Sequence, residues 1–243
     1  TDDASRIDWK HSANVPDLYV KEYEEEKDMD TFILLDVSDS MLFGTAEKLK
    51  AEYAAVMASA LVYASVDAGM NAGFGMYGDE STLILPDGGQ AQYRRVLHEA
   101  TDFENYGGSF NMEAVLKDLI GQIKENTALF IISDFIDVKG DWKPQLQVCS
   151  QKFRHVMSVM LKDLRDYKLP DSGYVRFSAP DGSSQRLVNT SNIREEYEQK
   201  AKEQEEDIKQ RLNASGSSFL KVDTRQNFSS QFAKYFDKEG ATW

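Results

Sequence analysis

Three side chains with oxygen donors follow an apolar run near the start of the sequence. Residues 32–35 are all apolar and lead directly into Asp36, and Ser38 and Ser40 follow at alternate positions. A short apolar run is typical of a strand buried on both faces of a parallel sheet. Open α/β sheets bind ligands at the carboxyl ends of such strands, and carboxylate and hydroxyl oxygens suit Mg²⁺ or Mn²⁺. The same residues also fit an ordinary capped turn, because Ser and Asp are favoured at helix N-caps.

Two further segments carry residues of the same kind. Residues 128–132 form a second apolar run, which Asp134 follows after one serine, and Ser109 follows a pair of glycines just before a predicted helix. Glycine permits backbone dihedrals that would bring this loop close to a metal ion. The residues that we predict around one divalent cation, Mg²⁺ or Mn²⁺, are Asp36, Ser38, Ser40, Ser109 and Asp134.

Strands and helices alternate in the predicted elements that position these residues. Apolar residues at steps of three and four predict helices over 44–66, 90–100, 112–123, 141–153, 193–212 and 228–236. Apolar runs and alternation predict strands over 31–36, 71–77, 81–85, 128–134, 155–161, 173–177, 185–188 and 219–222. This alternation favours an α/β fold with a doubly wound, Rossmann-like, mostly parallel sheet. We expect residues 1–30 to be an N-terminal extension and residues 31–243 to form a single domain.

Composition excludes several classes of partner. The formal net charge of −13 argues against binding to nucleic acid or to an anionic membrane, because both attract basic surfaces. No run approaches the ~20 apolar residues that a membrane helix requires. The lone Cys149 cannot form an intramolecular disulfide and favours a reducing compartment. We therefore expect a cytoplasmic location, with possible tethering to a membrane through sequence upstream of Thr1.

The order of the motifs resembles a known family. The segment 36–40 resembles the first motif of the metal-ion-dependent adhesion site (MIDAS) of von Willebrand factor A domains, with Ser109 where these usually carry threonine. Phe110 stands where an acidic residue is common, and Asp39 where many have glycine. Together with the segments 6–10, 22–28, 132–135 and 169–173, the chain is similar to the domain-of-unknown-function-58 (DUF58) family, which is found alongside MoxR-type AAA+ ATPases. That resemblance implies a von Willebrand factor A-type fold.

Three functions remain open at this point. The resemblance implies a non-enzymatic, metal-dependent interaction module, an adaptor or co-chaperone of a MoxR-type ATPase in protein complex assembly, whose partner supplies an acidic ligand. A metal-dependent phosphohydrolase with Asp36 as nucleophile is an alternative, but Ser38 stands where such enzymes need a second aspartate and no lysine is obviously placed for phosphate. A third is a von Willebrand factor A-like scaffold with a degenerate metal site. No general base stands beside the motifs, since the three histidines, His11, His98 and His155, fall elsewhere.

Overall fold

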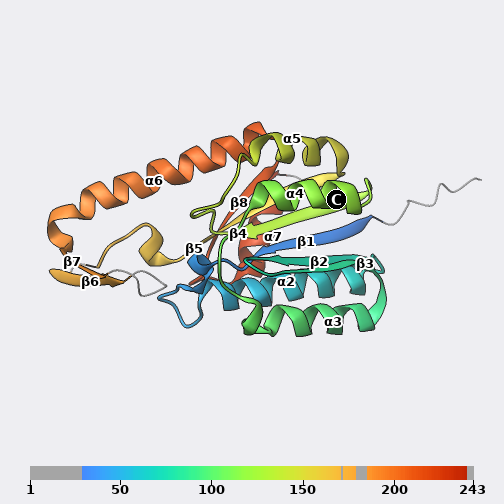
Figure 1. Cartoon of the computed structure of the whole chain (residues 1–243), viewed down its shortest axis with the longest axis horizontal. Helices are drawn as coiled ribbons and strands as arrows, with labels where there is room; N and C mark the ends of the chain where they lie inside the picture. The colour runs from blue at the N-terminus through green and yellow to red at the C-terminus, as the bar shows by residue number, and fades with distance from the viewer. Residues whose placement is uncertain (1–28, 171, 179–184, 240–243) are drawn as a thin grey trace, which may run out of the picture.

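A six-stranded sheet forms the centre of the molecule (Figure 1). The computed structural model describes residues 29–170, 172–178 and 185–239. The strand order is β3-β2-β1-β4-β5-β8. The bounds are β1 Asp30–Asp36, β2 Ala72–Tyr77, β3 Ser81–Asp87, β4 Thr127–Ser133, β5 His155–Lys162 and β8 Ser218–Asp223. Only β3 runs antiparallel to its neighbour within this sheet, so the predicted α/β fold with a mostly parallel sheet is confirmed.

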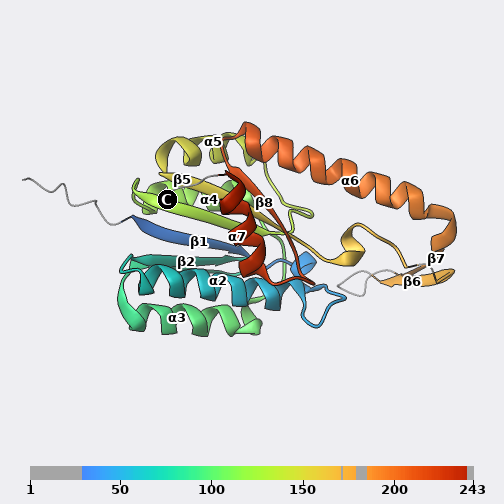
Figure 2. The ribbon, with the colours of Figure 1, turned by 180° about the vertical axis from the view of Figure 1, so that it is seen from behind.

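Helices cover both faces of this sheet (Figures 1 and 2). One face carries α2 (Lys50–Asp67), α3 (Gly89–Thr101) and α7 (Phe228–Glu239). The other carries α4 (Met112–Gln122), α5 (Lys143–Lys152) and the inner end of α6 (Thr190–Ala214). Short 3-10 turns, η2 (Asp39–Leu42), η3 (Phe103–Asn105) and η4 (Leu164–Asp166), follow or join these elements.

The central strands are buried on both faces because their side chains alternate between two cores. In β1, Ile33 and Leu35 enter the core beneath α2, whereas Phe32 and Leu34 enter the core beneath α4. All four are fully buried. Burial of a large apolar side chain contributes about 1.5–3 kcal/mol, so the unbroken apolar runs that predict these strands also stabilise them. Every residue of β1 and β4 is buried.

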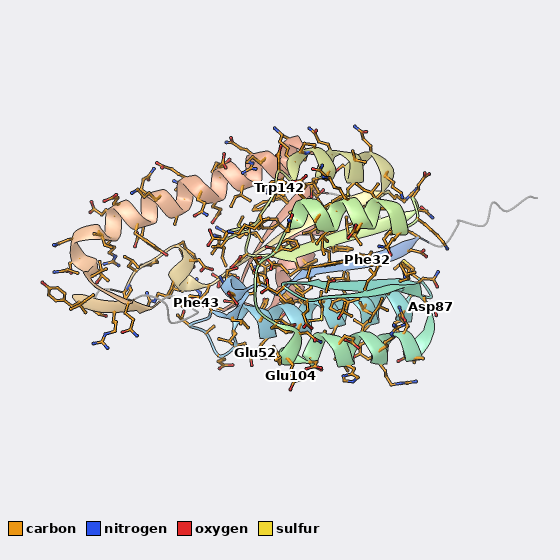
Figure 3. All side chains as sticks on the ribbon, viewed as in Figure 1. Phe32, Phe43, Glu52, Asp87, Glu104 and Trp142 are labelled. Carbon is orange, nitrogen blue, oxygen red and sulfur yellow. The ribbon has the colours of Figure 1, made fainter. Side chains whose placement is uncertain are left out.

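An arm extends beyond the carboxyl edge of the sheet (Figure 1). It consists of the outer end of α6 and the hairpin of β6 (Tyr174–Ser178) and β7 (Gln185–Asn189), which pair antiparallel in a separate two-stranded sheet. Ile208 and Leu212 anchor the inner end of α6 in the core. Arg211 lies over Trp142, with 4.5 Å from its guanidinium carbon to the ring centroid, and Figure 3 labels that tryptophan beneath the helix. Further out along α6, the Tyr197 hydroxyl donates a 2.6 Å hydrogen bond to the Arg165 carbonyl of η4, so the helix is held at a second point.

Several boundaries differ from the predicted ones. The helix predicted over 44–66 begins at Lys50, because residues 43–49 form an irregular loop that closes with a hydrogen bond from the Lys50 N–H to the Phe43 carbonyl. The N-terminal extension predicted over 1–30, with His11, lies outside the described residues apart from its last two positions. None of the described helices is long and apolar enough to cross a bilayer.

Candidate functional site

The carboxyl edge of β1 places the first group of polar side chains. The Asp36 side chain is fully buried and its Oδ1 accepts a 2.9 Å hydrogen bond from the Ser38 N–H, which fixes the turn that follows the strand. The Ser38 and Ser40 hydroxyl oxygens lie 3.3 Å apart, and Ser40 is part of the η2 turn. Strand order reverses at this point, because β1 leads to β2 on one side and pairs with β4 on the other. Such a switch point is where doubly wound sheets bind ligands.

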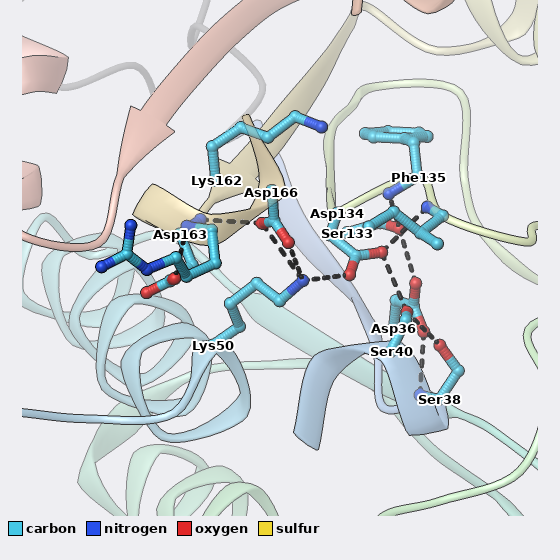
Figure 4. Close-up of polar contacts among 12 residues, drawn as sticks. Asp36, Ser38, Ser40, Lys50, Ser133, Asp134, Phe135, Lys162, Asp163 and Asp166 are labelled. Carbon is cyan, nitrogen blue, oxygen red and sulfur yellow. Dashed lines mark hydrogen bonds and ion pairs between the residues drawn. The ribbon is translucent and has the colours of Figure 1, made fainter. Parts of the chain in front are cut away.

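The end of β4 brings the second carboxylate to the same place. Ser133 donates a 2.5 Å hydrogen bond to Asp36 Oδ2, and the Ser40 hydroxyl donates a 3.0 Å hydrogen bond to Asp134 Oδ1. The Ile136 N–H also donates to that Asp134 oxygen, at 2.9 Å. Phe135 between them has a φ of 56°, a conformation that bulky residues rarely adopt. Hydrogen bonds to the Ser133 and Asp134 side chains thus hold the tight turn after β4 in this conformation (Figure 4).

A buried lysine completes this cluster. Lys50 is 1% exposed, at the start of α2, and its ammonium donates a 2.6 Å hydrogen bond to Asp134 Oδ2. The same ammonium lies 3.2 and 3.3 Å from the two carboxylate oxygens of Asp166, in the η4 turn. Burial alone would lower the pKa of Lys50, but Asp134 and Asp166 outweigh it and raise that pKa. Lys50 therefore stays charged and joins three elements at this edge.

The glycine loop approaches the same edge through its backbone. Gly107 donates to the Val37 carbonyl at 2.7 Å, and the Gly108 N–H donates to Asp39 Oδ1 at 2.8 Å. Ser109 donates its N–H to Asp79 Oδ1 at 3.0 Å, and its side chain is exposed. Among the described residues, no hydrogen bond joins the Ser109 hydroxyl to the other four predicted donors.

The electrostatics at this edge suit a cation. Burial, and then the nearby Asp134 carboxylate, raise the pKa of Asp36 to about 6. Two buried carboxylates thus converge beside two hydroxyl oxygens, which is a set of hard donors that suits Mg²⁺ or Mn²⁺. The described residues contain no cluster of three or more histidine, cysteine, aspartate or glutamate side chains that could hold a metal. A cation at this edge would therefore depend on serine hydroxyls as well as carboxylates, and the residues present fit that requirement.

Four of the five predicted donors lie in one hydrogen-bonded cluster, and within the described residues Ser109 makes no hydrogen bond to it. Sequence analysis missed three members of the surrounding network, Lys50, Ser133 and Asp166. The sequence alone places no lysine obviously for phosphate, and the structure shows that Lys50 and Lys162 are both buried at this edge. For Lys50 a signal existed, since it is in phase with buried Ala54 and Met57 on the apolar stripe of α2.

Two of the histidines lie in the described part of the chain. His98 is on α3, and His155 begins β5 at the end of that strand opposite Lys162. His155 is therefore remote from the carboxyl edge, and the hydrogen-bonded cluster contains no histidine.

The family model described as "Protein of unknown function DUF58" matches residues 1–207. The uncharacterized proteins Mb1516 of Mycobacterium bovis and Rv1480 of Mycobacterium tuberculosis are each 23% identical over 238 residues, which is 96% of this chain and 74% of theirs.

Solved structures share the fold. BatB from Bacteroides thetaiotaomicron aligns with a TM-score of 0.55 at 14% identity, over 87% of this chain and 98% of its own. An aerotolerance-related membrane protein from Bacteroides fragilis gives 0.54 at 15%, over 88% and 100%. The SpRpn10 VWA domain gives 0.51 at 10%, over 85% and 95%. The fold is therefore of the von Willebrand factor A type.

Proposed function

The chain belongs to the DUF58 family, and from that premise and the geometry of the edge we propose that it is a non-enzymatic, metal-dependent protein-interaction module. Asp36, Ser38, Ser40 and Asp134 would hold one Mg²⁺ or Mn²⁺ ion, with Ser109 as the fifth candidate. The observation that carries the proposal is the Ser40 hydroxyl, which donates to Asp134 and lies beside Ser38, so that the ends of β1 and β4 present their oxygens together.

The donor set explains why a partner would bind here. When bound, the divalent ion supplies an electrophilic centre that accepts a further oxygen ligand. Ser38 and Ser40 offer neutral hydroxyls, and Lys50 already shares the charge of Asp134. The side chains at this edge therefore leave part of a divalent charge unbalanced, and a carboxylate from a partner protein would complete it.

The surface beside the edge favours a protein ligand. Leu42 at the end of η2, and Phe43 and Leu49 in the loop that follows it, are 36%, 39% and 36% exposed. Aromatic and aliphatic side chains gathered in one loop are typical of the centre of a protein interface. Figure 3 labels Phe43 at this end of the molecule. We propose a MoxR-type AAA+ ATPase as the partner, with this chain acting as its adaptor or co-chaperone in protein complex assembly.

Size-exclusion chromatography of the chain mixed with the MoxR-type ATPase of the same genome tests this function. We expect co-elution in Mg²⁺, separation in chelator, and loss of co-elution for Asp36→Asn. Asp67→Asn is the matched control, because Asp67 is exposed at the far end of α2, and it should co-elute like wild type. Co-elution that ignores both chelator and Asp36→Asn would place the interface elsewhere.

One observation favours the phosphohydrolase alternative, because Lys50 and Lys162 are buried at this edge. Lys50 contacts Asp134 and Asp166, however, and Asp36 accepts from Ser38 and Ser133 instead. A phosphatase assay with p-nitrophenyl phosphate separates the two functions. Phosphate release that requires Asp36 would establish the enzyme, whereas we expect none. Absence of any cation binding would favour the scaffold with a degenerate site.

A further inference from the structure

Lys162 is a buried lysine whose ammonium has no direct partner among the described residues. It ends β5, is 3% exposed, and neither donates a hydrogen bond nor forms an ion pair within the described part of the chain. Burying a charge without a partner is unfavourable, and desolvation lowers the pKa of this lysine. The buried and unpartnered side-chain atoms of the described residues belong to Ser59, Thr127, Gln145 and Ser150, so the Lys162 ammonium is not sealed from solvent and an anion has access to it.

The neighbouring carboxylates do not act as direct partners of the Lys162 ammonium. Asp134, Asp166 and Glu205 lie within electrostatic reach of this ammonium and favour its charged form. Lys50 already contacts both aspartates, and the Lys221 ammonium lies 2.7 Å from a Glu205 oxygen. Each of these acids therefore has its hydrogen-bonding cation, and the ammonium at the end of β5 remains available to another anion.

Its position puts it beside the candidate cation site. β5 pairs with β4 in parallel, with Met160 opposite Ser133, so Lys162 lies just beyond the level of Asp134 at the carboxyl edge. Figure 4 shows its side chain extending past Asp166 toward the side of the site where Asp134 lies. We propose that the Lys162 ammonium binds one oxygen of the carboxylate through which a partner protein docks at this edge. This inference rests on the proposed function and assigns a second cationic contact to it.

The charge at the edge favours a carboxylate over a phosphate. Among the described residues, this edge gathers Asp36, Asp134, Asp163 and Asp166 with Lys50 and Lys162, and Glu205 also lies within electrostatic reach of the Lys162 ammonium. Acids outnumber lysines, so a singly charged carboxylate meets less repulsion than a doubly charged phosphate. An ammonium donating to a carboxylate oxygen also forms a charge-assisted hydrogen bond, which is stronger than a neutral one.

Titration of the ¹⁵N-labelled protein with sodium acetate, followed by NMR at the backbone amides of Ser38 and Ile136, tests the assignment with and without Mg²⁺. We expect Lys162→Met to weaken acetate binding about tenfold, and Lys162→Arg to retain it. Lys162→Met should bind Mg²⁺ at least as tightly as wild type, since it removes a like charge, whereas a misfolded variant would lose the ion. Lys168→Met, which removes an exposed lysine just after η4, is the control and should match wild type.

The outcomes are distinct. Equal acetate binding by wild type and Lys162→Met, or an equal loss in Lys168→Met, would overturn the inference. Tighter Lys162-dependent binding of inorganic phosphate than of acetate would overturn the carboxylate assignment. If wild type binds no Mg²⁺, the proposed function fails, and the titration without Mg²⁺ decides the inference. Acetate shifts that depend on Lys162 would then support it, and their absence would overturn it.

Discussion

Replacing Lys50 by methionine removes the ammonium that contacts both Asp134 and Asp166 and keeps nearly the same side-chain volume. Lys50 is 1% exposed and Asp134 is fully buried, so solvent does not replace the lost charge. Breaking a buried ion pair at one partner costs about 3–5 kcal/mol, because the other charge remains uncompensated. For a chain of this size, each kcal/mol lowers the unfolding midpoint by about 2–4 °C. We therefore expect a fall of roughly 10 °C in chelator.

Differential scanning calorimetry and urea unfolding in chelator measure this loss. Lys200→Met is the matched control, because Lys200 pairs with Glu196 at 2.6 Å on the exposed face of α6, and its midpoint should equal that of wild type. The double variant Lys50→Met/Asp134→Asn should recover part of the loss, since it removes one of the stranded charges. A loss below about 1 kcal/mol in Lys50→Met would refute the inference that this buried pair holds the edge together.

Three further predictions follow from other parts of the fold. Chelation should leave the far-UV circular dichroism unchanged, because two apolar cores and not a metal support the sheet; global unfolding in chelator would make the ion structural. Cys149 should resist thiol reagents at pH 8 until the protein is denatured, because burial raises the pKa of its thiol to about 12; rapid labelling of native protein would contradict this. Gly108→Ala should lower the thermal unfolding midpoint more than Gly69→Ala. Both glycines have a φ of 82°, which costs an alanine about 1–2 kcal/mol, but only at Gly108 would the new Cβ lie 2.1 Å from Asp79 Cγ. Equal losses in the two variants would show that this contact can relax.

The sheet was predictable because its strands lie between two helical layers. Runs such as 32–35 and 128–132 are apolar at every position, which only strands buried on both faces require. The location of Asp36 and Asp134 followed from the same rule, since the parallel strands β1 and β4 end at one edge. That rule predicts neighbours but gives no distances, so hydrogen bonds such as Ser40 to Asp134 needed the structure.

The ionic network could not be predicted from sequence spacing. Lys50 lies 84 residues from Asp134 and 116 from Asp166, and a lysine in the first turn of a helix usually faces solvent. Only its phase on the apolar stripe of α2 indicated burial. The arm was hidden for a similar reason, because the thin stripe of α6 does not reveal that only its inner end, at Ile208 and Leu212, packs on the core.

Isothermal titration of Mg²⁺ into wild type, Ser40→Ala and Asp67→Asn tests the central claim most directly. Ser40 is half-buried, so its substitution removes one hydroxyl donor with little effect on packing. The account predicts one Mg²⁺ site in wild type and in Asp67→Asn, and an affinity weaker by at least about tenfold in Ser40→Ala. Equal affinities in wild type and Ser40→Ala, or no binding by wild type, would contradict it.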